Sequence, residues 1–415
     1  MKEHITPNLY KLAKLFKKKG ELYIVGGFVR NSILGIYDTD IDLASKLTPE
    51  EIKSVLFGTK YEVKEKSKKL GTVTISLGEE KWEHATFRHE IYAKGGEHIP
   101  LKVEFIKDIK EDAKRRDFTV NAIYYNILKD EFVDFYNGFA DIKKKIIRTI
   151  EQPNYVFESD GLRILRMIRL ASELGFRINA ETLYSAYYYR ENLNDISGAR
   201  KLDELNMILS SDQKYKICKK NSFMQALRTF NSLKLWKYYY SPVLRIRYNL
   251  VKNVQPKNRF VALLIDILSC SKFKTDTTEL ANQILGKFGL GLPDSKVEYY
   301  KKIVFAYNDA LGKMENKEFF IKYFDDFDVI ADVLKYRSKF LYRKYNFFYN
   351  YLINNKVPIR LKDLKIGGAE IKSNYPKIKE KYYTTILTEL LSKVFDGSIK
   401  NEKQELIAEI AKVRV

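Results

Sequence analysis

The sequence predicts an α+β protein in which a small mixed domain of helices and strands precedes a long helical region. Over about the first 145 residues, candidate strands alternate with candidate helices. From residue 161 onward, apolar residues recur at spacings of three and four, with few candidate strands between them. The 415 residues also exceed the usual size of one hydrophobic core, so we expect about two to four packed units.

The spacing of apolar residues predicts the first four elements. Apolar residues at helical spacing over 9–16 predict a helix. The apolar run at 21–25 predicts a buried strand, which ends at the glycine pair that follows it. We expect a short helix over 28–34 and a second strand over 38–43.

The next elements complete the predicted sheet. Thr48 precedes a proline and two glutamates, which is typical of a helix start with a capping hydroxyl and acids near the positive end of the dipole. The runs at 72–77 and 82–88 predict a hairpin, and we expect residues 103–106 to continue the same sheet.

The amino-acid composition restricts the class of protein. Hydrophobic residues make up 45% of the chain and aromatic residues 14%, which excludes a globally disordered protein. Lys and Arg number 74 against 53 Asp and Glu, giving a net charge of +21. This excess predicts a polyanionic partner, either nucleic acid or an acidic membrane surface.

The sequence carries no signal for secretion or membrane insertion. It contains no apolar run of about 18 residues, and its charged start differs from the apolar core of a signal peptide. Cys218 and Cys270 are too few for a disulfide framework or a four-ligand zinc site. We therefore expect a soluble, cytoplasmic, basic protein.

A glycine pair followed by two spaced aspartates is the first motif that carries chemistry. Gly26 and Gly27 end a predicted strand, Arg30 lies in the next helix, and Asp40 and Asp42 lie in the second strand. Residues two apart on a strand point to the same face, where two carboxylates repel each other unless a cation lies between them. The pair suits Mg²⁺, and the glycine backbone with Arg30 suits a bound anion. The alternative is a glycine turn before a solvated strand edge.

A third carboxylate for this site has two candidates. Glu83 lies in a strand that we expect beside the aspartates, and Glu104 lies in the last strand candidate. The sequence leaves the choice open, and either residue can be an exposed strand residue without a role.

An arginine-rich segment over 111–122 is the second motif. It contains Arg116 and Asp117, and arginines clustered with an acid can clamp a phosphate or a ribose. The alternative is the charged start of a helix.

A polar stripe over 159–169 is the third motif. Asp160, Arg163, Arg166 and Arg169 recur every three residues and share one face of a predicted helix. A carboxylate accepts from an exocyclic amine, and a guanidinium donates to ring acceptors, so the stripe suits recognition of a base. The alternative is a ladder of surface salt bridges.

Taken in order, these motifs resemble those of the class II tRNA nucleotidyltransferases, the family of CCA-adding enzymes and bacterial poly(A) polymerases. The segments that carry the resemblance are Gly-Gly-x-Val-Arg, Asp-x-Asp, Arg-Arg-Asp-Phe-Thr-x-Asn-Ala and Asp-x-x-Arg-x-Leu-Arg. The similarity is dense over 21–210 and returns at 359–368, with little between 215 and 350.

The resemblance implies a fold and a division of the chain. The fold is a polymerase-β-like nucleotidyltransferase head with a small mixed sheet, followed by an all-α neck, body and tail. The implied limits are 1–145 for the catalytic head, 146–210 for a neck that recognises the base, 211–330 for the body and 331–415 for a tail that binds tRNA.

The resemblance also implies roles for the residues of the three motifs. Asp40 and Asp42 would hold Mg²⁺, and Glu83 would complete the catalytic set. The nucleotide would be bound by Gly26, Gly27 and Arg30 at the triphosphate, by Arg116 and Asp117 near the ribose, and by Asp160, Arg163, Arg166 and Arg169 at the base.

The implied reaction is the template-independent addition of C, C and A to the 3′ end of tRNA from CTP and ATP, with release of pyrophosphate. The implied partner is tRNA, bound through its acceptor and T arms, with no membrane and no obligate protein partner. One alternative is a poly(A) polymerase or a partial enzyme that adds only CC or only A. A second alternative is a non-catalytic basic RNA-binding protein.

The sequence departs from the family pattern at three places. Asn31 stands where the family usually has Asp, and Ser159 stands where it usually has Glu. The loop over 94–100 contains no arginine, whereas the family often has an Arg-Arg-Pro segment there. The family links this loop to the switch from C to A addition, so the altered loop leaves addition of CC alone as an alternative.

Overall fold

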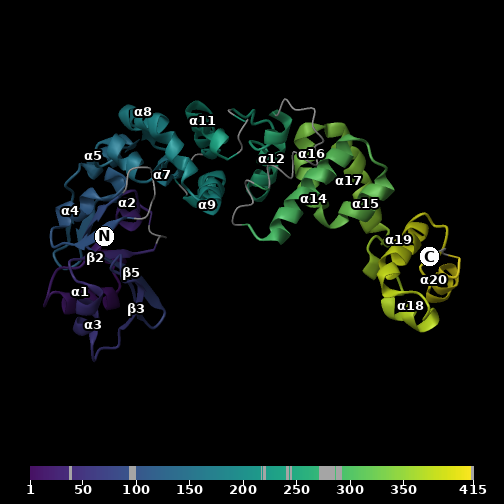
Figure 1. Cartoon of the computed structure of the whole chain (residues 1–415), viewed down its shortest axis with the longest axis horizontal. Coiled ribbons are helices and arrows are strands. Elements are labelled where there is room, and N and C mark those ends of the chain that lie inside the picture. Colours follow the sequence, from purple (N-terminus) through teal and green to yellow (C-terminus); the bar gives the residue numbers. More distant parts are fainter. Residues whose placement is uncertain are drawn as a thin grey trace. The chain divides into compact units, whose positions relative to one another are not determined.

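The computed structural model describes residues 1–36, 40–92, 100–215, 217, 221–239, 243, 245–270, 286 and 292–412. They form two compact units, the first built mainly from residues 1–246 and the second beginning at Arg247 (Figure 1). The mixed sheet lies in the first part of the chain and helices make up nearly all of the rest, which confirms the predicted α+β class.

A seven-stranded mixed sheet organises the N-terminal part of the first unit. In spatial order its strands are β3 (Glu62–Ser67), β4 (Thr72–Leu77), β5 (Glu80–Thr86), β2 (Asp42–Ser45), β1 (Tyr23–Val25), β8 (Tyr124–Asn126) and β9 (Glu131–Val133). Neighbouring strands are antiparallel except β2 and β5, which are parallel. The predicted hairpin of β4 and β5 is confirmed.

Two helices cover one face of this sheet. They are α1 (Pro7–Phe16) and α3 (Pro49–Leu56), and the side chains of β4 that point toward them are buried. The start of α3 is as predicted, because the Thr48 side chain accepts from the Glu51 backbone and the Glu51 side chain accepts from the Thr48 backbone. The opposite face of β3, β4 and β5 carries polar side chains.

The prediction that residues 103–106 continue the main sheet is wrong. Strand β7 (Lys102–Phe105) pairs instead with β6 (Arg88–Ile91) in a separate two-stranded sheet. Strand β5 has β4 on one side and β2 on the other, so neither of its edges is open to a further strand.

The rest of the first unit is mainly helical. Its helices are α2 (Gly27–Ile33), α4 (Ile109–Lys114), α5 (Gly138–Lys144), α6 (Pro153–Ser159), α7 (Leu162–Leu174), α8 (Ala180–Tyr188), α9 (Gly198–Leu209), α10 (Ser211–Lys214) and α11 (Phe223–Leu233). A short parallel pair, β10 (Ile146–Ile147) and β11 (Arg177–Ile178), lies between them. Helix α7 buries its apolar side and packs against α9, so its polar side is free to line a pocket.

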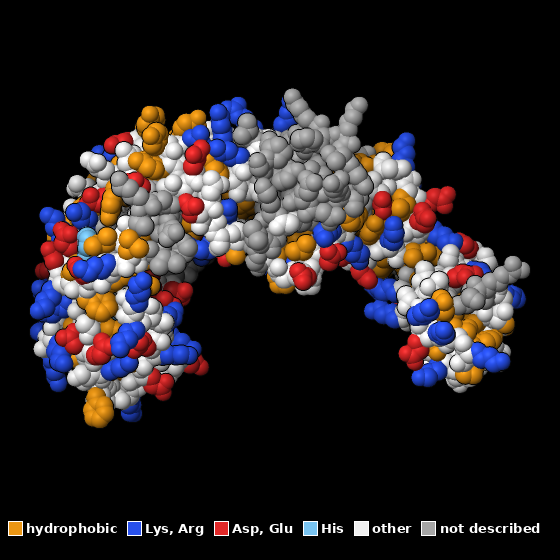
Figure 2. Space-filling view, viewed as in Figure 1, with side chains coloured by type: hydrophobic (Ala, Val, Ile, Leu, Met, Phe, Trp, Pro, Cys, Tyr) orange, Lys and Arg blue, Asp and Glu red, His pale blue; other side chains and the backbone are white. Residues whose placement is uncertain are grey.

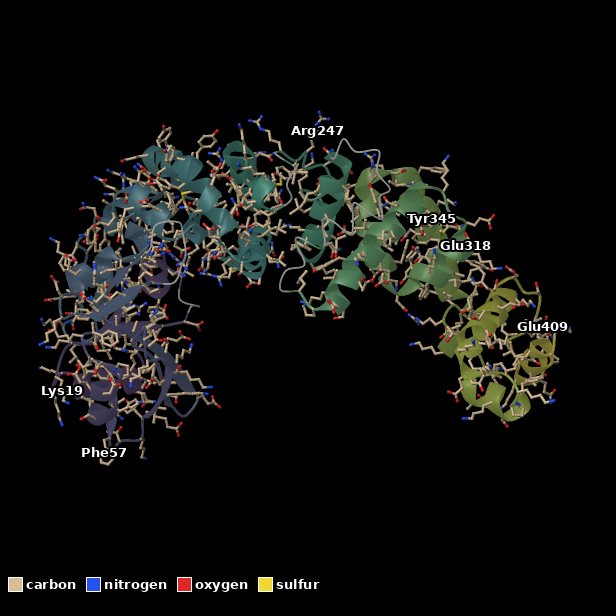
Figure 3. The ribbon with its side chains drawn as sticks, viewed as in Figure 1. Lys19, Phe57, Arg247, Glu318, Tyr345 and Glu409 are labelled. Atoms are coloured by element: carbon tan, nitrogen blue, oxygen red, sulfur yellow. The ribbon has the colours of Figure 1, made fainter. Side chains whose placement is uncertain are left out.

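The described part of the second unit is helical. Its helices are α12 (Arg259–Cys270), α14 (Asp294–Leu311), α15 (Asn316–Tyr323), α16 (Phe327–Arg337), α17 (Lys339–Asn354), α18 (Gly368–Asn374), α19 (Tyr383–Phe395) and α20 (Lys403–Ile410). Tyr345 points inward from α17, and its ring centroid lies 4.4 Å from that of Phe319 (Figure 3). Within the residues that the structure describes, no helix is long and apolar enough to cross a membrane.

Basic side chains are spread over the surface. Figure 2 shows Lys and Arg on the visible face of both units, with Asp and Glu among them. This distribution agrees with the net charge of +21 and does not by itself locate a partner.

Candidate active site

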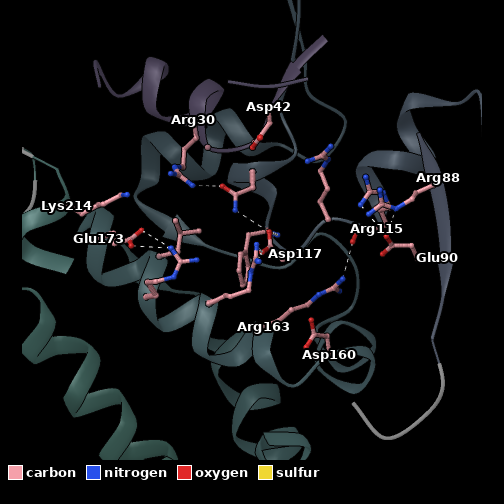
Figure 4. Close-up of a pocket in the computed structure, with 18 of the residues that line it drawn as sticks. Arg30, Asp42, Arg88, Glu90, Arg115, Asp117, Asp160, Arg163, Glu173 and Lys214 are labelled. Carbon is pink, nitrogen blue, oxygen red and sulfur yellow. Dashed lines mark hydrogen bonds and ion pairs between the residues drawn. The ribbon is translucent and has the colours of Figure 1, made fainter. Parts of the chain in front are cut away.

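A cavity of about 460 Å³ opens in the first unit, where the main sheet meets α7 (Figure 4). Eight Arg or Lys and five Asp or Glu line it. The predicted residues that it brings together are Gly26, Gly27, Arg30, Asp42, Arg116, Asp117, Asp160, Arg163, Arg166 and Arg169. All three sequence motifs therefore meet in one pocket.

The glycine turn between β1 and α2 begins one end of the pocket. Gly26 has a φ of +80°, a conformation that strains residues with a Cβ, which explains why glycine stands there. The turn starts α2, and one helical turn later Arg30 lies only 5% exposed.

Arg30 has neutral partners. Its Nε and Nη2 donate to Asn31 Oδ1 at 3.0 and 2.8 Å, and its Nη1 donates to Asn121 Oδ1 at 2.5 Å. Burial lowers the pKa of Arg30. Among the described residues no carboxylate forms an ion pair with Arg30, so its positive charge is directed to the pocket without a direct counter-ion.

Carboxylates gather beside this end of the pocket. Asp42 is the first residue of β2, and its register partner in β5 is Glu83. Burial and the charges of Glu83 and Asp40 together raise the pKa of Asp42 to about 6, against the opposing charge of Arg116. These carboxylates repel one another, which is the electrostatic condition that favours a bound cation.

Asp40 and Asp42 do not share a strand as predicted. Strand β2 begins at Asp42, opposite the last residue of β1, so Asp40 has no strand partner and lies exposed just before β2. Asp40 does not line the pocket but is near enough for its charge to act on Asp42.

The two candidates for a third carboxylate have different surroundings. Glu83 lies beside Asp42 and forms an ion pair with Lys66. Glu104 lies in the separate sheet, opposite His89, and forms an ion pair with Lys102. Of the two, Glu83 is the one that the fold places next to the aspartates.

Asp112 organises the arginines of the second motif. It is fully buried, and its two oxygens accept from Arg115 at 2.8 Å, from Arg116 at 3.3 Å and from the Tyr124 hydroxyl at 2.5 Å. Burial alone would raise the pKa of Asp112, but Arg115 and Arg116 outweigh it and hold the pKa at about 2. The carboxylate therefore stays ionised and fixes both guanidiniums at the pocket wall.

Asp117 connects the second motif to the third. Its Oδ2 accepts from Arg166 at 2.6 Å, and its Oδ1 accepts from Asn121 at 3.2 Å. Burial would raise the pKa of Asp117, but Arg166 and Arg163 lower it to about 2. Because Asn121 also accepts from Arg30, this network connects Arg30 to Arg166.

Asp160 and Arg163 form the far end of the pocket (Figure 4). Asp160 Oδ1 accepts from the backbone of Leu162, the first residue of α7, at 2.9 Å. The Arg163 guanidinium donates to the Arg115 carbonyl at 3.3 Å and lies 5.8 Å from the centre of the Tyr92 ring. An acceptor and a fork of donors thus lie side by side, although only Arg163 is on the helix predicted for both.

Arg169, the last residue of the stripe, has partners of its own. It forms ion pairs with Glu173 at 3.2 Å and with Glu204 at 2.7 Å. Its side chain lines the pocket, and it also ties α7 to α9.

Several pocket residues were not singled out from the sequence. Glu90 forms an ion pair with Arg88 at 2.6 Å and accepts from the Tyr92 hydroxyl at 2.5 Å, and Asn121 joins two networks. Arg88, Glu90 and Tyr92 are every second residue along β6 and the position that follows it. This alternation is the sequence pattern that could have identified them as neighbours on one face. The loop expected at 94–100 lies outside the described residues, apart from Pro100.

The chain is similar to known proteins in both sequence and structure. Residues 22–148 match the family described as Poly A polymerase head domain. The CCA-adding enzyme of Staphylococcus epidermidis is 27% identical over 413 residues, which cover 95% of each chain. Poly(A) polymerase I of Escherichia coli is 28% identical over 331 residues, which cover 75% of this chain and 68% of that protein. The crystal structure of the Bacillus stearothermophilus CCA-adding enzyme in complex with CTP has the same fold, with a TM-score of 0.75 at 22% identity, covering 97% of this chain and 96% of that one.

Proposed function

We propose that the chain is a member of the family of class II tRNA nucleotidyltransferases and bacterial poly(A) polymerases, and that it adds C, C and A to the 3′ end of tRNA from CTP and ATP. The observation that carries the proposal is one pocket with Asp42 at one end and Asp160 with Arg163 at the other. Transfer of a selected nucleotide needs both ends, a charge site at the reacting phosphate and a polar site at the base.

The base end suits cytosine and adenine. Both bases present an exocyclic amine beside a ring acceptor, which match the Asp160 carboxylate and the Arg163 guanidinium. Uracil would place a carbonyl against Asp160 and a ring N–H against Arg163, so both contacts would be repulsive. One pocket can therefore accept CTP and ATP and refuse UTP.

The positive end suits the triphosphate. Arg30 and Arg116 line the pocket near Asp42, and guanidiniums bind phosphate oxygens with paired hydrogen bonds. In the proposed reaction the terminal ribose hydroxyl of the RNA attacks the α-phosphate in line, and pyrophosphate leaves toward these arginines. Fixed cations at that position stabilise the leaving group without reorganisation.

The carboxylates suit Mg²⁺. Asp42, with its raised pKa, Asp40 and Glu83 are hard oxygen donors whose repulsion a divalent cation would remove. Within the described residues no group of three His, Cys, Asp or Glu side chains is placed to hold a metal ion. Mg²⁺ is usually held by one or two carboxylates together with substrate phosphates. Bound there, Mg²⁺ would lower the pKa of the ribose hydroxyl and neutralise charge on the reacting phosphate.

The alternative is a poly(A) polymerase. The extent of similarity favours the first proposal, because the match to the Staphylococcus epidermidis enzyme covers 95% of that protein, whereas the match to poly(A) polymerase I covers 68%. The division into head, neck, body and tRNA-binding tail, with limits at 145, 210 and 330, and a cytoplasmic location remain parts of this proposal.

A nucleotide-addition assay tests the proposal. The purified chain is incubated with tRNA lacking CCA and with each labelled NTP alone and in combination. We expect two additions from CTP alone, one further addition when ATP is present, and none from UTP or GTP. Long A tails would indicate a poly(A) polymerase, termination after two C would indicate a CC-adding enzyme, and no addition would indicate a binding protein.

A further inference from the structure

The outward face of β3, β4 and β5 is a polar surface next to the pocket. Its side chains are Glu62, Lys64 and Lys66 on β3, Thr72, Thr74 and Ser76 on β4, and Lys81 and Glu83 on β5. The lysines and glutamates of this face are exposed, and the Thr and Ser side chains are half-buried. We name these eight side chains the outer sheet face.

The other face of the same strands is occupied. Glu80 of β5 accepts from Asn8 of α1 at 2.6 Å, and Glu65 of β3 accepts from Lys53 of α3 at 2.9 Å. The two faces therefore have different roles, since one is the packing surface for α1 and α3 and the other carries charges and hydroxyls.

The strand register places a row of side chains across the outer sheet face, and this row ends at the carboxylates. Lys64 is opposite Thr74, Thr74 is opposite Glu83, and Glu83 is opposite Asp42. Neighbouring strands lie about 4.8 Å apart, so the row spans roughly 15 Å from the sheet edge to Asp42. A basic edge, a hydroxyl and the carboxylates thus follow one another in a straight row.

A β-bulge directs a second lysine to the same place. The register of β3 shifts between Glu65 and Ser67, and Lys66 lies in that shift. The Lys66 ammonium forms an ion pair with Glu83, and its charge also acts on Asp42. Bulges re-aim single side chains, and here the one residue that is re-aimed is a cation beside the carboxylates.

The geometry of in-line nucleotide transfer indicates which substrate approaches the outer sheet face. The pocket lies on one side of Asp42, and none of the residues that line it comes from β3, β4 or β5. In an in-line reaction the attacking hydroxyl and the leaving pyrophosphate lie on opposite sides of the α-phosphate. If the pocket takes the nucleotide, the attacking RNA end must approach Asp42 from the other side, where the outer sheet face begins.

We propose that the outer sheet face binds the sugar-phosphate backbone of the RNA 3′ end and guides its terminal ribose to Asp42. Lysines and hydroxyls are the side chains that contact phosphates and sugars without reading the base, which suits an enzyme that must accept many tRNA sequences. Lys64 and Lys66 contact phosphates, and Thr74 contacts a phosphate or ribose oxygen. The proposal rests on the proposed function, because it takes RNA as the acceptor.

Charge removal at the sheet edge tests the proposal. Lys64→Gln and Lys66→Gln keep the length of the side chain and remove its charge. We expect each change to weaken binding of a minihelix RNA that ends in CC roughly three- to tenfold. The log–log salt slope should fall by about 0.7 for each single-strand phosphate that the protein no longer neutralises. Binding of CTP without RNA should change less than twofold.

A matched control is Lys53→Gln. Lys53 also forms an exposed ion pair with a glutamate of β3, but on the α3 side of the sheet. It should leave RNA affinity and salt slope unchanged. Unchanged RNA affinity and slope in both Lys64→Gln and Lys66→Gln would overturn the proposal, as would an equal weakening in Lys53→Gln.

Photocrosslinking supplies a second readout that does not depend on a folded variant. A minihelix with 4-thiouridine at its last or second-last nucleotide is crosslinked to the wild-type chain, and the peptide is identified by mass spectrometry. Crosslinks within residues 62–86 support the proposal, and crosslinks confined to other parts of the chain overturn it. Failure of the proposed function would differ, because the wild-type chain would then add no nucleotide to tRNA at all.

Discussion

Two aspartates in the same pocket are held in opposite ways. Asp117 lies 2.6 Å from Arg166, and its pKa is lowered to about 2. Asp42 lies beside Glu83 and Asp40, and its pKa is raised to about 6. Burial disfavours the ionised form of both carboxylates. At Asp117 the charges of Arg166 and Arg163 outweigh burial, whereas at Asp42 the charge of Arg116 does not, because Glu83 and Asp40 act in the same direction as burial.

Asp112 and Asp117 belong to a fixed framework of the pocket, and Asp42 lies at the end where we propose that the reaction takes place. Asp112 and Asp117 are satisfied by arginines in the protein itself, so they hold those arginines in place whether or not a substrate is bound. Asp42 has Glu83 and Asp40 as neighbours as well as Arg116, so the protein balances its charge less fully, as the proposed cation site requires. Unbalanced charge of this kind costs stability and is retained where function needs it.

The largest effect should come from removing charge at the reactive end. Asp42→Asn takes away a carboxylate of the proposed cation site, and we expect nucleotide transfer to fall at least ~10²-fold. RNA affinity should stay within a few-fold, because it comes mainly from Lys and Arg elsewhere. Single-turnover transfer and filter binding measure the two quantities.

Comparing variants of Glu83 and Glu104 tests which glutamate acts together with Asp42. Glu83→Gln should reduce transfer, since Glu83 is the register partner of Asp42, whereas Glu104→Gln in the separate sheet should not. Equal activity of the two variants would remove Glu83 from the site. Near-wild-type transfer in Asp42→Asn would contradict the cation assignment altogether.

The next effect concerns selection of the base. Asp160→Asn keeps an oxygen that can accept from the Leu162 backbone and replaces the other acceptor by an amide donor, which can pair with the uracil carbonyl. We expect the ratio of kcat/KM for CTP over UTP to fall by about 10- to 100-fold, equivalent to ~1–3 kcal/mol.

Glu158→Gln is the control for this change. Glu158 is one residue before the predicted position of the family acid and does not line the pocket. An unchanged CTP preference in Asp160→Asn, or a loss in Glu158→Gln instead, would show that Asp160 does not read the base.

The local features of the fold and of this pocket could be predicted from the sequence. The capping box of α3, the glycine turn and the arginine segments depend on neighbours within a few residues, and the structure has them where they were expected. The chain then brings the segments together because β1 and β2 are central strands, which puts the glycine turn and Asp42 beside each other.

The remaining features depend on distant partners, which a local pattern does not specify. The sequence pattern of β7 predicts a further strand of the main sheet, but both edges of β5 are already paired, with β4 and β2. The sequence pattern places Asp40 in a strand, but β1 ends at Val25, opposite Asp42, so Asp40 has no residue of β1 to pair with. Asn121 lies in the second motif, but its role in joining Arg30 to Asp117 appears only when α2 meets the segment 117–121.

A smaller effect should follow from changing the neutral partner of Arg30. Asn31→Asp would place a carboxylate against the buried guanidinium, where Asn31 Nδ2 now has no hydrogen-bond partner within the described residues. We expect the KM for CTP and ATP to rise by about three- to tenfold with little change in kcat, because the added charge competes with the triphosphate. Asn31→Gln, which adds no charge, is the control, and an unchanged KM in Asn31→Asp would show that the charge of Arg30 is not used for the nucleotide.

The smallest effect, and the most direct test of the comparison, is the pH dependence of stability. The pKa of Asp42 is higher in the folded chain than in an unfolded one, so its stabilising contribution is present below about pH 4 and is lost as the pH rises through about 6. The pKa of Asp117 is lower in the folded chain, so its contribution is present above about pH 4 and is lost as the pH falls toward 2. The contributions of Asp42 and Asp117 to stability should therefore change in opposite directions as the pH rises.

Thermal unfolding in EDTA between pH 4 and pH 8 makes the test. Asp42→Asn should unfold ~2–4 °C above the wild type at pH 8, corresponding to ~1 kcal/mol after allowance for solvent screening, and the gap should close toward pH 4. Asp117→Asn should unfold below the wild type at pH 8, because Arg166 loses its counter-ion, with the deficit shrinking as the pH falls. Added Mg²⁺ should stabilise the wild type and leave Asp42→Asn nearly unaffected, because only the wild type offers the cation its full set of carboxylates. If instead Asp42→Asn is less stable than the wild type at pH 8 without Mg²⁺, Asp42 is balanced by the protein itself, and the distinction between the two aspartates does not hold.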